Sequence, residues 1–371
     1  MLSNEELQRY SRHILLPEVN KSGQEKLKSA KVLVIGAGGL GCPVLLYLVS
    51  AGVGTIGIID FDTVSLSNLH RQVLYTENDI NKAKVHVAKQ NLEKLNPHTQ
   101  INAYNKSLTT TNARKLIADY DIIIDGSDNF STRYLVNDAC ILENKPLVYG
   151  AIQQFEGQIS VFNYKGGPSY RCLFPELPDA SIIPSCSEAG VLGVLPGIIG
   201  TQMASETIKI ILEKGEVLSG KLVLINILNN IYQTIRFNKN QAGIDYMKLR
   251  ENEFEKTDYQ VLCNEKTEQK NEITFTDFIR IIANKNPFQL VDVREIYEDP
   301  KLNYPQTVQI PLGEIREQII LLNKELPTVV ICQSGKRSLA AANLLKTEFQ
   351  FTNVTSLKGG IQENLSEIFS L

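Results

Sequence analysis

The stretch VLVIGAGGLGCP, residues 32–43, constrains the fold of this chain more than any other. Four apolar residues lead directly into a glycine-rich turn, and an apolar, helix-like segment, VLLYLVSAGV, follows. Gly36, Gly38 and Gly41 match the pattern G-x-G-x-x-G, in which glycine permits a tight strand-to-helix turn. Because the motif lies between a strand and a helix, it favours a phosphate site at the helix N-terminus. NAD, FAD and ATP all remain possible nucleotides at this point.

Strand and helix patterns alternate over the first 240 residues. This alternation predicts a Rossmann-like α/β fold with a doubly wound, mostly parallel sheet. Later segments read as antiparallel strands with turns, which extend the sheet at one edge. Parallel strands are expected at 31–35, 54–60, 100–104, 120–125 and 146–150, and antiparallel strands at 158–164 and within 221–237.

The character of the sequence changes after the first 240 residues. Residues 239–272 are polar and charged with weak periodicity, which is typical of a linker. A second alternation of strand and helix patterns then covers about 100 residues, the size of one small α/β domain. The sequence therefore predicts a first domain at 1–240, a linker at 241–272 and a second domain at 273–371.

Composition and charge exclude several classes of protein. The net charge of −3 gives no sign of nucleic-acid binding. The N-terminus lacks the basic start and unbroken apolar run of a signal peptide, and the longest apolar stretch is interrupted by Pro196 and then turns polar. The six cysteines are scattered without a C-x-x-C pair, so no disulfide framework is expected. We therefore expect a cytoplasmic protein with neither membrane nor nucleic-acid partners.

Charged residues after the glycine motif narrow the choice of nucleotide. Asp60 ends the second strand, where a ribose-binding acid is expected. Arg71 and Lys84 add fixed positive charge, which a nucleotidyl-transfer enzyme uses to stabilise phosphate charge in the transition state and a hydride-transferring enzyme does not need. Asp128 follows a strand at the carboxyl edge of the sheet. It can be a Mg²⁺ ligand or, alternatively, a helix N-cap in competition with Ser131.

Three motifs together resemble a known family. GAGGLG, DFDTVSLSNLHRQ and DGSDN, in this order, are similar to motifs of the molybdopterin-synthase and thiamine-pathway adenylyltransferases, the bacterial relatives of ubiquitin-activating enzymes. The resemblance covers residues 3–237. It implies MgATP-dependent adenylation of the C-terminal glycine carboxylate of a ubiquitin-like sulfur carrier ending in Gly-Gly. Adenylation makes the carboxylate electrophilic, and no general base is needed because the carboxylate is already ionised.

The same resemblance implies a homodimer and roles for individual residues. Arg12, in RYSRHILL, matches an arginine that family members extend across a dimer interface to the ATP of the partner subunit. Asp128 is implied to hold Mg²⁺ and, with Arg71, to belong to the catalytic set. Gly39 and Asp60 are implied to contact adenosine and ribose, Asn68, Arg71 and Lys84 to hold the phosphates, and Asn129 to lie near Asp128.

Cys186 is the first cysteine with a predicted catalytic role. It lies in IIPSCSEAGVLGVLPG, where a partly polar, glycine-rich loop leads into an apolar helix, and a thiol near a helix N-terminus is acidified. The family has a cysteine here in a mobile crossover loop, and in some members it links covalently to the carrier. The alternative is a buried, inert cysteine, which is the role expected for Cys42 and Cys140.

The sequence predicts that structural zinc is absent. Many family members have C-Y-R-C in the region of residues 169–172 and a later C-x-x-C, which together form a Cys₄ zinc site. In this chain Ser169 replaces the first cysteine, Cys172 remains, and no C-x-x-C follows. With one zinc ligand left, we expect packing to hold this edge of the first domain.

Cys332 lies in TVVICQSGKRSLAAANLL, where a buried strand ends and a helix begins near Arg337. Backbone N–H groups, the helix dipole and two cations would surround the sulfur, and such surroundings stabilise a persulfide anion. With LVDVREIYED and LKGGI, the motif resembles a rhodanese domain over 273–371, in which Asp292 and Arg294 shape the domain. A cysteine phosphatase, the alternative, needs a longer loop than the four residues between Cys332 and Arg337. The predicted persulfide loop comprises Cys332, Gln333, Ser334, Gly335, Lys336 and Arg337.

We interpret the chain as an adenylyltransferase joined to a sulfurtransferase. A persulfide on Cys332, loaded by a donor such as a cysteine desulfurase, would attack the carrier adenylate, with Cys186 as a candidate reducing thiol. The product would be a carrier thiocarboxylate for molybdenum cofactor, thiamine or related sulfur pathways. An NAD-dependent oxidoreductase fused to a sulfurtransferase domain is one alternative. A non-catalytic scaffold and an enzyme that activates another carboxylate, as in relatives that dehydrate modified tRNA bases, are the others.

Overall fold

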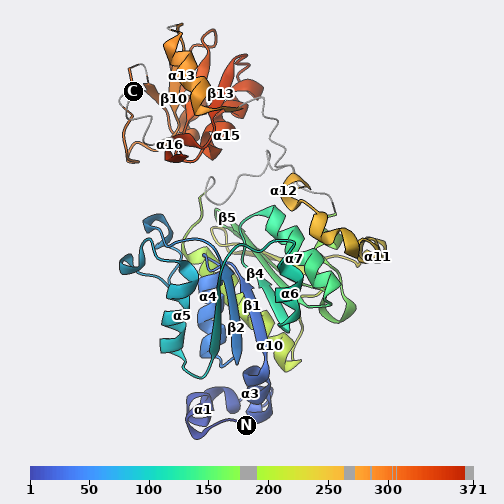
Figure 1. Ribbon diagram of the computed structural model, residues 1–371. Helices are drawn as coiled ribbons and strands as arrows, with labels where there is room; N and C mark the ends of the chain where they lie inside the picture. The colour runs from blue at the N-terminus through green and yellow to red at the C-terminus, as the bar shows by residue number, and fades with distance from the viewer. Residues whose placement is uncertain (176–189, 263–271, 285, 303, 306, 364–371) are drawn as a thin grey trace. The chain divides into compact units, whose positions relative to one another are not determined.

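The computed structural model describes residues 1–175, 190–262, 272–284, 286–302, 304–305 and 307–363. The chain folds as two compact units, residues 1–264 and 265–371, each with its own sheet and hydrophobic core (Figure 1). Within the described ranges, no helix combines the length and the apolar character that are required to cross a membrane.

In the described part of the first unit, eight strands form one sheet in the order β3-β2-β1-β4-β5-β6-β7-β8. The strands from β3 to β5 in this order are parallel, whereas β5 to β8 pair in antiparallel fashion. This sheet confirms the predicted Rossmann-like architecture with an antiparallel extension. The strands are β1 (Lys31–Ile35), β2 (Thr55–Asp60), β3 (Gln100–Asn105), β4 (Ile122–Asp125), β5 (Leu147–Gln153), β6 (Glu156–Phe162), β7 (Lys221–Asn226) and β8 (Ile231–Arg236).

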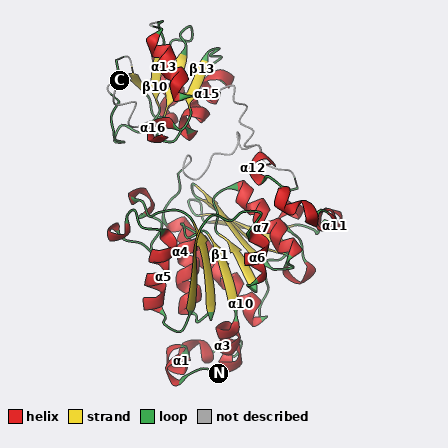
Figure 2. Cartoon of the chain, viewed as in Figure 1, coloured by secondary structure: helices red, strands yellow, loops and turns green. Residues whose placement is uncertain are grey.

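Alternation along β1 assigns its side chains to two cores, because successive side chains of a strand point to opposite faces. Val32 and Val34 lie in one core, while Leu33 and Ile35 lie in the other. Helices therefore cover both faces of the sheet (Figure 2). The first face is covered by α4 (Gly41–Ser50), α5 (Lys84–Leu95) and α10 (Val194–Leu212), and the second by α6 (Ala113–Ala118), α7 (Phe130–Leu142) and α8 (Tyr170–Leu173).

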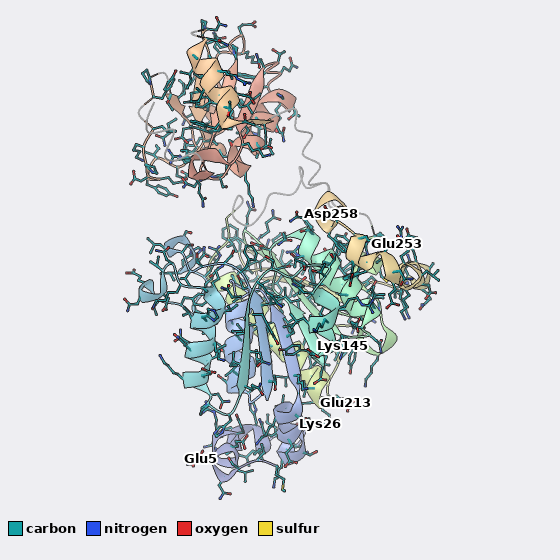
Figure 3. All side chains as sticks on the ribbon, viewed as in Figure 1. Glu5, Lys26, Lys145, Glu213, Glu253 and Asp258 are labelled. Carbon is teal, nitrogen blue, oxygen red and sulfur yellow. The ribbon has the colours of Figure 1, made fainter. Side chains whose placement is uncertain are left out.

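The helices before β1 lie at the amino end of that strand. They are α1 (Asn4–Arg9), α2 (Ser11–Ile14) and α3 (Asn20–Ser29), and α3 ends directly before β1 begins. Lys26 of α3 pairs with Glu213, which directly follows α10, and the Lys26 Nζ to Glu213 Oε2 distance is 3.0 Å. Both residues are labelled in Figure 3. The N-terminal helices are thereby attached at the amino ends of the strands. The glycine turn lies at the opposite edge of the sheet, because it follows the carboxyl end of β1.

Residues 241–262 differ from the predicted linker because they are helical and packed. Phe254 and Tyr259 are buried in the core that contains Leu33, and the Tyr259 hydroxyl donates to Asp138 Oδ2 at 2.7 Å. Two buried aromatic residues in a polar segment leave no periodicity, so the pattern missed them. The limits of the predicted domains remain proposals, and 263–271 lie outside the described residues. The packed elements are α11 (Gln241–Leu249), η4 (Glu251–Lys256) and α12 (Tyr259–Leu262), with Glu253 and Asp258 exposed (Figure 3).

In the described part of the second unit, five parallel strands form a sheet in the order β11-β10-β12-β13-β9. Val330 and Cys332 face one core, whereas Val329 and Ile331 face the other. This is the small α/β fold that the second alternation predicts. Its elements are β9 (Glu272–Ile273), α13 (Phe275–Ala283), β10 (Gln289–Asp292), β11 (Thr307–Gln309), α14 (Ile315–Gln318), β12 (Thr328–Ile331), α15 (Lys336–Thr347), β13 (Val354–Leu357) and α16 (Gly360–Glu363).

Candidate functional site

The glycine-rich turn after β1 lies directly against the loop after β4. Gly36 has a φ of +90°, and a Cβ added there would lie 2.9 Å from the Gly126 carbonyl oxygen. A Cβ at Gly41 would lie 2.0 Å from the Gly36 carbonyl oxygen. Side chains are therefore excluded at both glycines, and the chain turns tightly from β1 into the start of α4.

Asp60 joins this turn to the end of β2. The Ala37 N–H donates to Asp60 Oδ2 at 2.8 Å, and the Asp62 N–H donates to Asp60 Oδ1 at 2.8 Å. On the other side of the turn, the buried Tyr75 hydroxyl donates to the Ala37 carbonyl oxygen at 2.8 Å. Each carboxylate oxygen of Asp60 has a second lone pair, so a ribose hydroxyl can still donate to it.

The predicted cations converge on the turn from two other elements. Lys84, the first residue of α5, is 5% exposed, and its Nζ pairs with Asp62 Oδ2 at 2.7 Å. The Arg71 Nη1 donates to the Ser67 carbonyl oxygen at 3.1 Å, and Arg71 Cδ lies 3.7 Å from where a Cβ of Gly39 would be. Positive charge is therefore held at the carboxyl edge of the sheet, where phosphates of a bound nucleotide would lie.

Asn68 lies on the same segment as Arg71. It ends the short helix η1 (Leu66–Asn68), and its Nδ2 donates to Ser67 Oγ at 3.4 Å. Its carbonyl oxygen accepts the Arg71 N–H at 3.1 Å, so the two side chains leave one turn. The structure therefore brings Gly39, Asp60, Asn68, Arg71 and Lys84 to the same edge of the sheet.

Two carboxylates at the end of β4 and in the loop after it, Asp125 and Asp128, have different surroundings. Asp125 is buried, which raises the pKa of its carboxyl, and its Oδ1 accepts the Ser127 N–H at 2.9 Å. Asp128 is exposed and receives one contact, from Asn129 Nδ2 to Oδ1 at 3.4 Å. Asn129, rather than Asp128 or Ser131, is the N-cap of α7, because its Oδ1 accepts the Thr132 N–H at 2.9 Å. The Asp128 carboxylate is thus not needed by the helix, and it fits the role of an Mg²⁺ ligand.

Arg12 lies apart from these residues within its own chain. It is exposed on α2, which packs against α3 at the amino end of β1. The glycine turn and Asp128 follow the carboxyl ends of β1 and β4. The structure therefore does not bring Arg12 to the predicted nucleotide site of the same subunit.

Cys332 directly follows β12 and is fully buried. The Ser338 N–H donates to Cys332 Sγ at 3.2 Å, and Ser338 Oγ lies 3.4 Å from the same sulfur. Gly335, with a φ of +86°, turns the chain into α15, and the Ile361 N–H donates to the Cys332 carbonyl oxygen at 2.9 Å. The sulfur is therefore held by one loop and the first turn of one helix.

The two predicted cations of the persulfide loop have different surroundings. Arg337 forms a bidentate pair with Glu298, with Nη1 to Oε1 at 2.5 Å and Nη2 to Oε2 at 2.7 Å. The hydrogen bonds from Arg337 lower the pKa of the Glu298 carboxyl. Lys336 is exposed. The positive charge of Arg337 is therefore compensated by Glu298, whereas that of Lys336 faces solvent.

Asp292 and Arg294 have the structural role that the sequence predicts. Both are almost fully buried, and Arg294 Nη2 donates to Asp292 Oδ2 at 2.7 Å and to the Pro300 carbonyl oxygen at 2.9 Å. A buried, bidentate pair of this kind requires each partner to compensate the charge of the other. It fixes the loop that carries Glu298.

Three of the other cysteines lie within the described residues, whereas Cys263, like Cys186, does not. Cys42 and Cys140 are fully buried core residues, as predicted, and burial raises the pKa of the Cys42 thiol to about 12. Cys172 Sγ accepts the N–H groups of Ser169 at 3.3 Å and Asn240 at 3.2 Å. The described residues contain no group of three or more metal-ligating side chains, and the absence of structural zinc stays a prediction. Cys186 lies outside the described residues.

Several residues near these sites were not found from the sequence. Asp62 had a signal, because it stands two positions after Asp60 in the same motif. Ser338 had a weaker one, since it directly follows the persulfide loop. Glu298 lies within the motif LVDVREIYED and Ser356 directly before LKGGI, but both are distant from Cys332 in sequence, and neither motif assigned them a contact with the loop.

Two protein-family models match this chain, one in each unit. The model of the ThiF family matches residues 10–245, and that of the rhodanese-like domain matches residues 274–367. A protein of Aedes aegypti named "Adenylyltransferase and sulfurtransferase MOCS3" is 40% identical over 94% of this chain and 84% of its own length. A "Sulfur carrier protein adenylyltransferase" of Thermus thermophilus is 50% identical over 64% of this chain and 90% of its own length.

Solved structures share the fold of this chain. A crystal structure of Escherichia coli MccB with MccA-N7isoASN has a TM-score of 0.56 and 25% identity, covering 64% of this chain and 73% of that one. The crystal structure of PaaA also has a TM-score of 0.56, with 24% identity, 64% of this chain and 76% of that chain. The PaaA likeness concerns the fold alone.

Proposed function

The chain is a member of the ThiF family that carries a rhodanese-like domain, and we propose that it activates and thiolates a ubiquitin-like sulfur carrier. It is an adenylyltransferase and a sulfurtransferase: the first unit adenylates the C-terminal glycine carboxylate of the carrier, and the second delivers sulfur from Cys332. One observation supports this most strongly. A glycine turn with two cations and an uncommitted carboxylate occurs in the same chain as a buried sulfur at a helix N-terminus.

In the first step, the carrier carboxylate attacks the α-phosphate of ATP, and the bond to pyrophosphate breaks. Asp60 orients the ribose, while Arg71 and Lys84 stabilise the charge that develops on the departing pyrophosphate. To reach a phosphate, Lys84 exchanges its contact with Asp62 for one with the nucleotide. Asp128, with Asn129 nearby, would hold Mg²⁺, which supplies further charge stabilisation when bound.

In the second step, the persulfide on Cys332 attacks the carbonyl carbon of the adenylate, and AMP leaves. The product is an acyl disulfide between the carrier and Cys332. A thiol then attacks Cys332 Sγ, which forms a disulfide with it and releases the carrier as a thiocarboxylate. Cys186 is our candidate for this thiol, because the family has a cysteine in the corresponding loop. A Cys186→Ser variant with full thiocarboxylate output would contradict this role.

The assembly and the cellular setting are part of the proposal. We propose a homodimer, because Arg12 is exposed at the edge of the sheet opposite its own nucleotide site and could act only on that of a partner subunit. A cysteine desulfurase is the proposed class of sulfur donor, the cytoplasm the proposed location, and molybdenum cofactor or thiamine synthesis the proposed pathways. The alternative of an NAD-dependent oxidoreductase is not favoured, since the relatives are named adenylyltransferases.

ATP–pyrophosphate exchange with a carrier that ends in Gly-Gly tests this proposal. Wild type and the variants Asp128→Ala and Asp119→Ala would be compared, since Asp119 is an exposed carboxylate at the C-terminus of α6, away from the site. We expect carrier-dependent exchange that falls by about 100-fold or more in Asp128→Ala and stays unchanged in Asp119→Ala. No exchange with any carrier, together with saturable NAD binding, would return the glycine turn to a dinucleotide role.

A further inference from the structure

Two buried serine hydroxyls form a connected group with the sulfur of Cys332. Cys332, Ser338 and Ser356 are all fully buried. Ser338 Oγ lies 3.4 Å from Cys332 Sγ, 2.9 Å from the Gly335 carbonyl oxygen and 2.8 Å from Ser356 Oγ. Ser356 Oγ lies 3.4 Å from the same Gly335 carbonyl oxygen. The three side chains and one carbonyl therefore form a closed hydrogen-bonding group.

The number of protons in this group limits its hydrogen bonds. A serine hydroxyl has one proton and two lone pairs, so it donates once at a time. Ser338 has three possible acceptors within reach, and Ser356 has two. The Ser338 N–H donates to the sulfur in every case, since its direction is fixed by α15. The two hydroxyls therefore have more than one arrangement of donors and acceptors open to them.

When Cys332 is a thiol, its proton can be donated to Ser338 Oγ. Ser338 then donates to the Gly335 carbonyl oxygen, and Ser356 donates to Ser338 Oγ. Every buried polar proton has an acceptor in this arrangement. When Cys332 carries a persulfide, Sγ is bonded to Cβ and to the second sulfur, has no proton, and can only accept.

We propose that Ser338 and Ser356 are positioning residues that reverse their hydrogen bonds when Cys332 is loaded with sulfur. Ser338 rotates its hydroxyl to donate to Cys332 Sγ, and Ser356 rotates its own to donate to the Gly335 carbonyl oxygen. The exchange moves two protons by rotation and no heavy atom. The rotation gives the loaded sulfur a hydroxyl donor in addition to the Ser338 N–H, while each hydroxyl proton keeps an acceptor in both forms.

The loading reaction itself balances without a further reagent. A persulfide donor, RS–SH, gives its outer sulfur to Cys332, so that the donor S–S bond breaks and a new S–S bond forms. The proton of the Cys332 thiol ends on the donor, which leaves as the thiol RSH. This inference rests on the proposed function, because it assumes that Cys332 carries sulfur.

The test is sulfur loading of the full chain by glutathione persulfide, followed by mass spectrometry of the peptide that contains Cys332. Wild type would be compared with Ser338→Ala, Ser356→Ala, Ser356→Thr and Thr347→Val, the last being an exposed hydroxyl on the same helix. The rate of loading and the equilibrium ratio of persulfide to thiol are both measured. Thermal unfolding of the full chain checks that the second unit of each variant is folded, and carrier-dependent ATP–pyrophosphate exchange checks that the first unit is unaffected.

We expect Ser338→Ala to lower the persulfide-to-thiol ratio by about tenfold, because the sulfur loses a hydroxyl donor. Ser356→Ala should lower the persulfide-to-thiol ratio by about threefold. Ser356→Thr, which keeps the hydroxyl, and Thr347→Val should both have the wild-type ratio. Equal ratios in wild type and Ser338→Ala, with loading intact, would overturn the inference alone. A wild-type chain that takes up no sulfur would overturn the proposed function with it.

Discussion

Two turns of the molecule, after β1 and after β12, use the same backbone device for different chemistry. Each follows a buried strand, contains a glycine with positive φ and leads into a helix: Gly36 at +90° before α4, and Gly335 at +86° before α15. The first turn is completed by side chains from other elements, including Asp60, Lys84 and Asp128. The second closes around Cys332, which belongs to its own loop.

The difference follows from the size of the group that each turn would hold. A triphosphate extends beyond one helix N-terminus, so its charge is stabilised by cations and carboxylates from several strands and loops. A single sulfur atom is small enough to be held by the backbone and hydroxyl groups of one loop. The first turn therefore depends on long-range folding for its charges, while the second depends on the local geometry between Cys332 and Ser338.

Removing the sulfur should separate the two turns most completely. We expect Cys332→Ala to abolish sulfur loading and to leave carrier-dependent ATP–pyrophosphate exchange at the wild-type rate, because the exchange needs the first unit alone. Loading would be measured with glutathione persulfide and mass spectrometry. Because exchange reports on the first unit alone, thermal unfolding of the full chain checks that the second unit is folded in the variant. Loss of exchange in Cys332→Ala would contradict the division of labour.

Removing a cation near the first turn should have the reverse effect: ATP–pyrophosphate exchange should fall while sulfur loading stays unchanged. We expect Lys84→Met to lower kcat/KM for ATP in the exchange reaction by about 100-fold, because a cation that stabilises the transition state is lost and the aliphatic stem is kept. Sulfur loading of Cys332 should not change. Lys89→Met, on an exposed position of the same helix, is the matched control. A similar loss in both variants would point to helix damage instead.

The ion pair between Lys84 and Asp62 offers a smaller test. We expect Asp62→Asn to lower the free energy of unfolding by about 1 kcal/mol without nucleotide, because the buried Lys84 loses the partner that compensates its charge. The loss is small because Asp62 is half exposed, so that solvent already screens the pair. Added MgATP should stabilise the variant more than wild type, since the phosphates replace the missing carboxylate. Thermal unfolding measures both effects. Glu93→Gln, which removes an exposed pair with Lys89, should show neither.

An effect of similar size is expected for the pair of Glu298 and Arg337 in the second unit. Hydrogen bonds from Arg337 lower the pKa of the Glu298 carboxyl below its ordinary value of 4.5, so the pair stabilises the fold above that pH and loses this contribution as pH falls through the folded pKa. We expect Glu298→Gln to cost about 1 kcal/mol at pH 7, and the difference from wild type to vanish at the acid end.

Unfolding of the full chain at a series of pH values measures this difference. Glu348→Gln is the control, because its partner Arg316 is a surface cation and both side chains are well exposed. An equal loss in the two variants, or a Glu298→Gln difference that grows on acidification, would contradict the role of this pair.

The sequence predicted the sheet and the motif-bearing turns because both depend on local patterns. The run 31–35 and the glycines after it define the first turn, and TVVIC defines the second. The packing of Phe254 and Tyr259 was missed, since Phe254 stands alone among charged residues and Tyr259 begins only a short apolar stretch, YQVLC. The pairing of Arg337 with Glu298 was missed because the two lie far apart until β10 and β12 pair. Local sequence patterns thus identified the two turns, whereas residues that contact them from distant parts of the sequence, such as Glu298, could be identified only from the structure.

The central claim is that the sulfur of Cys332 reaches the carboxylate that the first unit activates. The most direct measurement is mass spectrometry of a Gly-Gly carrier after incubation with MgATP, a reducing thiol and a chain loaded with isotopically labelled sulfur on Cys332. The account predicts that one carboxylate oxygen is replaced by labelled sulfur, only with ATP and only when Cys332 is present. Labelled thiocarboxylate formed to the same extent by Cys332→Ala, or without ATP, would contradict it.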